Sequence, residues 1–243
     1  MARHKPTAEG GYQRGEETRA RIVESALRLF GEHGFEGAST RDIATHAGVN
    51  APALQYYFDN KEGVYRACVE FILERVWEQL AAPIVQAETV LSEADCDDQR
   101  LIDTYLALLS GFIGFIHDSP SGRDWRLFMA REQAGFGPPG TLELMDQRLH
   151  RRLGAVTTGL IGRLTGLPAD DERTLIRTFA INSQGLVFRV LRRQVLGVLG
   201  WQDIDRTRME KVRQVLLGQT ALTLRALVQE RDSGGSNTEQ CCR

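Results

Sequence analysis

The sequence lacks the patterns of several large enzyme classes. No segment alternates apolar and polar residues over enough positions to indicate a β-strand. The glycine fingerprints of dinucleotide-binding folds and of P-loops are both missing, and so is the Glu-x-x-His motif that di-iron helical bundles require in pairs. These absences exclude a Rossmann fold, a P-loop nucleotidase and a di-iron bundle. No pairing of a nucleophile with a base is apparent either, so we expect a protein that is not an enzyme.

Long hydrophobic runs are also missing. The most apolar stretch, residues 101–116, is shorter than the roughly 20 residues of a membrane span and contains Asp103. No apolar region follows the first charged residues, so we expect no secretory signal. The formal net charge is only −2, so any binding of nucleic acid must come from a local patch rather than from bulk charge.

Cysteine is scarce and carries no metal-binding pattern. The four cysteines, Cys68, Cys96, Cys241 and Cys242, do not have the spacing of a zinc module. We therefore expect reduced thiols in a cytoplasmic protein, with no metal and no cofactor. A redox role for Cys68 or Cys96 stays open at this point.

The clearest positive signal is the segment of residues 39–58, STRDIATHAGVNAPALQYYF. Ser39 and Asp42 have the spacing of a capping pair that starts a helix. Gly48 can adopt the positive φ that ends this helix, and Asn50 is a preferred N-cap for a second helix with Pro52 in its first turn. The pattern predicts a helix-turn-helix, whose second helix enters the DNA major groove, although an ordinary αα-corner has similar spacing.

The flanking segments predict an all-α chain with two domains. Arg3, Lys5 and Arg14 give the start a basic character, and an amphipathic helix over residues 16–34 completes a three-helix domain. A long helix begins near Lys61, and Pro83 is expected to end it. We expect a disordered basic arm (1–15), a helix-turn-helix domain (16–60), a larger helical effector-binding and dimerisation domain (61–230) and a disordered tail (231–243). In the larger domain, helices are expected over 97–117, 123–133, 141–165, 171–199 and 205–229.

Two segments resemble a known family. The segment TRARIVESALRLFGEHGFEGASTRDIATHAGVNAPALQYYFDNKEGVY has the A-x-x-L-F helix end, the G-F-x-x-x-S step, the D-I-A-x-x-A-G-V turn and the L-x-x-Y-F end of the N-terminal domain of TetR/AcrR regulators. The segment NSQGLVFRVLRRQVLGVLGW resembles the C-terminal domain of the CecR-type subgroup. The resemblance implies an all-helical homodimer that binds operator DNA and releases it when a small molecule binds.

Helix geometry and this resemblance together predict the DNA contacts. Free N–H groups at the starts of the two helices, near Thr40 and Ala51, suit phosphates. Gln55 can pair with adenine, which is worth roughly 1–3 kcal/mol of discrimination, whereas Ala51 and Ala53 can only touch thymine methyls. Many relatives have a lysine or a small polar residue where this chain has Ala51 and Pro52, which predicts few base contacts and more dependence on DNA shape. The predicted DNA-binding residues are Thr40, Arg41, Asn50, Ala51, Pro52, Ala53, Gln55, Tyr56, Tyr57 and Lys61. The last three resemble the family's phosphate contacts.

The family places its effector pocket among the middle helices. The candidates in this chain are polar residues within apolar runs and aromatic residues near them: Phe112, His117, Arg126, Phe128, Glu132, Asn182, Gln184 and Arg189. Each has a structural alternative. Arg126 and Glu132 also suit an ion-paired surface, His117 suits a helix end, and the aromatic residues suit the core.

The last two long helices are predicted to form the homodimer interface. Their apolar positions are Leu175, Phe179, Leu186, Val190, Val212, Leu216, Thr223 and Leu227, and Ser183 and Gly185 are small enough for close crossing. The sequence therefore predicts a ligand-responsive repressor of a palindromic operator, without identifying the effector, the operator or the genes. The alternative is a helical protein-interaction or small-molecule-binding protein whose helix-turn-helix is non-functional.

Overall fold

The computed structural model describes residues 8–117 and 122–240, and every regular element in these two ranges is a helix. This finding confirms the all-α prediction. The chain divides into two compact units, residues 1–74 with 121–146 and residues 75–120 with 147–243. Within the described residues, no helix has the length and the apolar character that crossing a bilayer requires.

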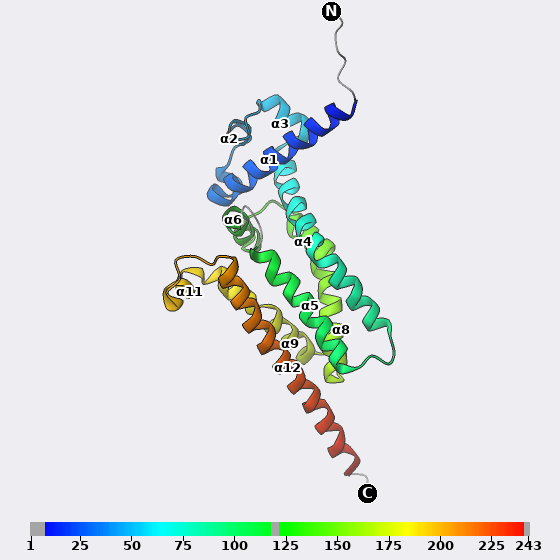
Figure 1. The fold of residues 1–243 in the computed structure, drawn as a ribbon. Coiled ribbons are helices and arrows are strands. Elements are labelled where there is room, and N and C mark those ends of the chain that lie inside the picture. Colours follow the sequence, from blue (N-terminus) through cyan, green and yellow to red (C-terminus); the bar gives the residue numbers. More distant parts are fainter. Residues whose placement is uncertain (1–7, 118–121, 241–243) are drawn as a thin grey trace, which may run out of the picture. The chain divides into compact units, whose positions relative to one another are not determined.

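The first unit is built on the helix α1, which packs against α2 and α6 (Figure 1). Its elements are α1 (Ala8–Gly37), α2 (Thr40–His46), α3 (Ala51–Phe58), the start of α4 (Lys61–Ser92), α6 (Gly122–Gln133) and α7 (Thr141–Met145). Their core consists of buried apolar side chains, the largest of which belong to Phe30, Tyr65 and Phe128. Gly34 leaves the helical region of α1 at φ 77°, a conformation that glycine adopts without steric cost.

Helix α6 belongs to this first unit, which the sequence did not reveal. The guanidinium of Arg131 donates from Nε to Gly31 O at 2.9 Å and from Nη2 to Glu32 O at 3.0 Å. Gly31 allows the close approach, because a Cβ there would lie 3.0 Å from Asp124 O. The predicted boundary at residue 60 is therefore too simple, since residues 121–146 return to the N-terminal unit.

The second unit is a set of long helices. It contains the rest of α4 together with α5 (Asp98–His117), α8 (Arg151–Thr165), α9 (Glu172–Asn182) and α12 (Arg206–Gln240), and α12 packs on both α5 and α8. Arg231 near the end of α12 forms a two-pronged ion pair with Asp98 at the start of α5, with N–O distances of 2.9 and 2.8 Å. This pair ties the two helix ends together.

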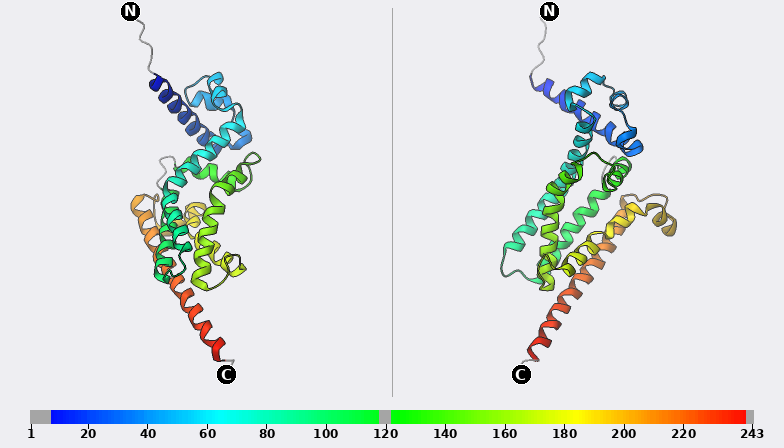
Figure 2. Two further views of the ribbon diagram at one scale, coloured as in Figure 1. Left: turned by 90° about the vertical axis from the view of Figure 1, so that its right-hand side faces the viewer. Right: turned by 180° about the vertical axis from the view of Figure 1, so that it is seen from behind.

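Two predicted long helices are interrupted. Residues 141–165 form α7, the π-helical turn η1 (Asp146–His150) and α8. Residues 171–199 form α9, the 3-10 turn η2 (Gln184–Leu186), α10 (Val187–Val190) and α11 (Arg192–Leu199). The second interruption has a physical reason. Asn182 and Gln184 both bond inward, to α5 and to α12, and residues two apart in an unbroken helix face opposite sides. Figure 2 shows α11 projecting from the rest of this unit, and none of its residues is buried.

Pro83 does not end the long helix as expected. Helix α4 continues through Pro83 to Ser92, although proline removes one backbone hydrogen bond. Buried apolar residues on both sides of the proline, Leu80 and Ile84, keep the same face packed. Tertiary packing therefore outweighs the local cost of proline.

Helices reach into both segments that the sequence predicted to be disordered. Helix α1 already begins at Ala8, so residues 8–15 of the expected arm are helical, and residues 1–7 lie outside the described part. Helix α12 extends to Gln240, so most of the expected tail 231–243 is helical as well. Once a packed helix exists, each further residue adds a hydrogen bond without a new nucleation step.

Cys68 is buried in the first unit. Its exposed fraction is 0%, and its thiol donates to Val23 O on α1 at 3.7 Å. Burial raises the pKa of this thiol well above its ordinary value. Among the described residues no group of histidine, cysteine and acidic side chains could hold a metal ion.

Candidate functional site

The two helices of the predicted helix-turn-helix are capped as the sequence indicated. Ser39 Oγ accepts from Asp42 N at 3.1 Å, which starts α2, and Asn50 Oδ1 accepts from Ala53 N at 2.8 Å, which starts α3. Gly48 between them has φ 66°. Ile43 and Leu54 are buried, so the inner faces of both helices pack within the first unit and their outer faces stay free. The local sequence was sufficient to predict the two caps and the glycine turn.

Helix α3 presents a short polar and aromatic face to solvent. The side chains of Ala51, Pro52, Gln55 and Tyr56 are exposed, and Tyr56 has an exposed fraction of 84%. Tyr56 and Tyr57 pack edge to face, with ring centroids 5.4 Å apart. An exposed aromatic side chain of this size beside a glutamine suits contacts with another molecule rather than with the core.

The remaining predicted DNA contacts lie around this face. Arg41 and Asn50 are exposed, whereas Thr40, Ala53 and Tyr57 are half-buried. Lys61 has structural contacts, because its ammonium donates to Glu36 O at 3.3 Å and lies 4.6 Å from the centre of the Phe35 ring. A phosphate contact by Lys61 therefore stays a prediction that competes with this anchoring role.

Three predicted effector residues lie in the first unit. Phe128 and Glu132 are both fully buried, and Glu132 Oε2 accepts from Tyr65 Oη at 2.7 Å. Burial, together with this hydrogen bond, raises the pKa of Tyr65, so its hydroxyl stays a donor. The expectation of an ion-paired surface for Glu132 is wrong, since α6 turns this residue into the core. Arg126 on the same helix is half-buried.

A cavity in the second unit brings two other predicted residues together. It has a volume of about 40 Å³ and lies between α5, α8 and α9. Phe112 and Asn182 line it, and Tyr105 Oη donates to Asn182 Oδ1 at 2.8 Å. The other lining residues are Leu108, Leu109, Leu153 and Thr157. Burial raises the pKa of Tyr105, so this apolar cavity contains one neutral polar pair.

Gln184 lies on the other side of the helix break. Its Nε2 donates to Thr220 Oγ1 on α12 at 3.4 Å, and its Oε1 is buried without a partner among the described residues. Gln184 does not line the cavity. The side chains of His117 and Arg189 lie outside the described part, so their predicted role has no structural account.

The second unit also exposes a set of large apolar side chains. The most exposed residues of the set on α9, α10 and α12 are Ile176, Phe179, Val190, Val215 and Leu222, with exposed fractions between 59 and 74%. The positions predicted for the dimer interface fall into an exposed group and a buried group. Phe179 and Val190 are exposed, but Val212 and Leu216 are buried within the chain. The sequence periodicity could not separate these two kinds of burial.

The sequence patterns of two known families match the chain, one around the helix-turn-helix and one in the C-terminal part. The family described as bacterial regulatory proteins, tetR family, matches residues 22–68. The C-terminal domain of the HTH-type transcriptional dual regulator CecR matches residues 101–227, which is more than half of the chain. The chain belongs to the TetR family of transcriptional regulators. It is therefore a DNA-binding regulator and not an enzyme, as the sequence predicted.

The chain is also similar to individual transcriptional regulators. The chain is 29% identical over 216 residues to the dual regulator CecR of Shigella flexneri, covering 89% of this chain and 95% of that protein. It is 43% identical over 65 residues to the regulator RaaS of Mycobacterium tuberculosis, covering 27% of this chain and 30% of that protein.

A solved structure shares the fold. AibR, crystallised with isovaleryl coenzyme A and operator DNA, superposes with a TM-score of 0.60 at 18% identity, covering 83% of this chain and 97% of AibR. At this identity the likeness concerns the fold alone.

Two features of this TetR-family chain were not predicted from its sequence. The pairing of Tyr65 with Glu132 joins residues 67 positions apart, and no periodicity signals it. Tyr105 was also missed as a cavity residue, although it lies two turns before Phe112 on the same apolar helix. Its spacing from Phe112 was the one signal available.

Proposed function

We propose that this TetR-family regulator is a repressor that binds a palindromic operator as a homodimer and is released by a small-molecule effector. The observation that carries the proposal is the exposed face of α3, with Gln55 and Tyr56, on a helix whose other face is packed and whose start is capped. A helix held in this way can enter a groove as a rigid body. Operator DNA as the partner implies a cytoplasmic site of action.

The roles within this face follow from side-chain chemistry. Gln55 is the residue best suited to reading a base, because its amide can donate and accept on one adenine edge. Arg41, Thr40, Asn50 and Tyr56 suit phosphates and set the register of the helix. Ala51, Pro52 and Ala53 offer only apolar contact, so indirect readout of DNA shape contributes to specificity.

The effector site is proposed at the cavity between α5, α8 and α9. A volume of about 40 Å³ holds water but is far below the roughly 300–1,000 Å³ of drug-sized ligand pockets. An effector of that size therefore binds an opened state and shifts the population toward it. Tyr105 and Asn182 supply the hydrogen-bonding group that orients the effector in otherwise apolar surroundings.

The homodimer is proposed to form through the exposed apolar face of the second unit, with Phe179 on α9, Val190 on α10 and Val215 on α12. Side chains of this size that are left in water by a single chain are a signature of a protein interface. A two-fold pairing presents two α3 helices and therefore favours a palindromic DNA site.

Selection of genomic DNA fragments by the purified chain tests the proposal. We expect enrichment of a palindrome, with an affinity that falls steeply as salt rises. A small-molecule screen against that complex should find a compound that releases the DNA, and a reporter gene placed behind the palindrome should be more active without the protein. Equal binding to all fragments would instead favour a helical ligand-binding protein with a non-functional helix-turn-helix. A reporter that needs the protein for expression would replace repression by activation.

A further inference from the structure

The junction between α3 and α4 has an unusual backbone. Asp59 has φ 57° and ψ −56°, and it is the single non-glycine residue with positive φ among the described residues. Phe58 O accepts from Asn60 N across it at 2.5 Å. This combination is a γ-turn of the rare positive-φ kind, which is strained for a residue with a Cβ. A strained turn persists only when its surroundings hold it.

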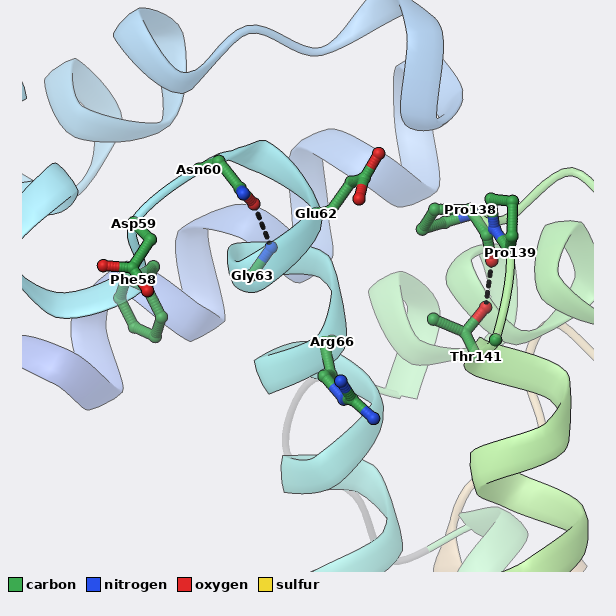
Figure 3. Close-up of a pocket in the computed structure, with 10 residues that line it drawn as sticks. Phe58, Asp59, Asn60, Glu62, Gly63, Arg66, Pro138, Pro139 and Thr141 are labelled. Atoms are coloured by element: carbon green, nitrogen blue, oxygen red, sulfur yellow. Dashed lines mark hydrogen bonds between the residues drawn. The ribbon is translucent and has the colours of Figure 1, made fainter.

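Gly63 is the residue that makes this turn possible. A Cβ on Gly63 would lie 2.1 Å from Phe58 O and 3.2 Å from Phe58 C, and both are backbone atoms. The Gly63 amide donates to Asn60 Oδ1 at 2.8 Å, which caps the start of α4 (Figure 3). The turn thus brings the last carbonyl of α3 onto the first turn of α4, in space that only glycine leaves free.

Side-chain packing on the outer side of the junction is weak. A hollow of about 260 Å³ lies there, bordered by residues 58–60, 62, 63 and 66 and by the loop at residues 138–141 (Figure 3). On the inner side Phe58 is buried, and the guanidinium of Arg19 lies 5.4 Å from its ring centre. On the outer side, the turn and its hydrogen bonds therefore fix the direction of α3 relative to α4, and on the inner side the burial of Phe58 does so.

We propose that Gly63 is a positioning residue for DNA reading, which fixes the recognition helix α3 against α4 through the contact of Phe58 O with its bare Cα. The inference rests on the proposed role of α3 in reading DNA. Any side chain at position 63 moves the end of α3, which carries Gln55 and Tyr56. Base contacts need closer alignment than phosphate contacts, so the shift lowers selectivity more than overall DNA affinity.

The first test compares Gly63→Ala with Gly154→Ala in the full-length chain. Gly154 is helical and a Cβ there meets nothing within 4 Å, so this control makes the same chemical change without a clash. The probe is a DNA fragment selected by the wild-type chain, measured beside a scrambled fragment. We expect Gly63→Ala to lower the ratio of the two affinities by about tenfold or more, the loss typical of one mismatched base pair. Gly154→Ala should retain the wild-type ratio.

The second variant, Asp59→Gly, separates positioning from folding. Glycine tolerates positive φ, so the melting temperature should stay equal or rise. The freed turn samples other conformations. If about a third of molecules keep the competent one, affinity for the selected fragment falls about threefold. Affinity for the scrambled fragment rests on phosphate contacts and stays the same, so the ratio of the two affinities also falls about threefold. If the turn mattered only for folding, the melting temperature and the DNA affinity of Asp59→Gly would change in the same direction.

The outcomes are distinct. If wild-type protein selects no fragment, the proposed function fails. If it selects one and both variants retain its selectivity, the positioning role is wrong while the proposed function stands. If Gly63→Ala does not fold, the Asp59→Gly result decides alone, and unchanged selectivity overturns the role.

Discussion

The carboxylate of Glu132 depends on a single hydroxyl group. It is fully buried, Tyr65 Oη donates to its Oε2 at 2.7 Å, and its Oε1 has no partner among the described residues. A buried carboxylate with so few partners is costly unless those partners are kept. The contact also joins α4 to α6, so one hydroxyl helps to hold α6 in the first unit.

Tyr65→Phe should therefore destabilise the protein by roughly 1–3 kcal/mol, the usual cost of leaving a buried polar group unpaired. Urea unfolding followed by circular dichroism measures the effect. Tyr56→Phe removes the same atom from a side chain that is 84% exposed and should leave stability unchanged. Equal unfolding of Tyr65→Phe and wild-type protein would show that the hydrogen bond contributes nothing net.

At the DNA face, Gln55→Ala and Arg41→Ala should change DNA binding in different ways. Loss of Gln55 should relax preference at one base position, by roughly 1–3 kcal/mol. Loss of Arg41 should weaken binding to all sequences and reduce the salt slope by about 1. Binding titrations on the selected palindrome and on its single-base variants measure both. A uniform loss for Gln55→Ala would contradict its role as a base reader.

Among the helices, the ion pair of Arg231 with Asp98 holds α12 to α5. The hydrogen bond from Arg231 lowers the pKa of Asp98 below its usual value of 3.8. The folded-state pKa is lowered, so the stabilisation is present above the unfolded value and disappears as the pH falls through the folded one. Both side chains are about a third exposed, which screens the pair.

Arg231→Gln should consequently cost about 1 kcal/mol or less at pH 7, the range of partly exposed pairs. The difference from wild-type protein should shrink as the pH falls below about 3.8. Thermal melts at several pH values between neutral and pH 3 measure it. A difference that stays constant over this range would mean that Arg231 acts through packing of its aliphatic stem rather than through charge.

The helices that the sequence predicted well are those fixed by their neighbours in the chain. The caps at Ser39 and Asn50 and the turn at Gly48 involve residues within three positions of one another, so the local sequence determines them. The interruption after Asn182 was missed because its cause lies on α5 and α12, 36 or more positions away. Pro83 was misread for the same reason, since burial of Leu80 and Ile84 overrides a local signal.

The candidate sites also differ in whether neighbouring or distant residues form them. The exposed face of α3 belongs to one short helix, so caps and apolar positions in the local sequence were enough to predict the helix. Its contacts with DNA stay a prediction. The cavity combines side chains from three helices, and a sequence does not show which of its polar residues meet. The fold brings Phe112 and Asn182 together at one cavity, while Phe128 and Glu132 belong to another core. The effector role of these residues stays a prediction.

For the whole molecule, self-association is the decisive property. Phe179→Glu places a charge on a side chain that is 74% exposed, so the single chain should fold normally. We expect it to weaken the homodimer and reduce binding to the palindrome, while binding to a half-site changes little. Light scattering and DNA titration measure the two effects.

Leu142→Glu is the matched control, because Leu142 is 45% exposed on α7 in the first unit. A dimer unaffected by Phe179→Glu would place the interface elsewhere, and a dimer disrupted equally by both changes would indicate a nonspecific effect of charge.

The buried thiol of Cys68 can report how often the first unit opens. Thiols react as thiolates, and Cys68 is buried against Val23 O with a raised pKa, so a maleimide reaches it only when the first unit opens. Cys96, which is half-exposed in the second unit, should react at once and serves as the reference. Peptide mass spectrometry of the maleimide adducts over time then measures the free energy of opening. Bound operator DNA should slow the labelling of Cys68 in proportion to its affinity for the closed unit.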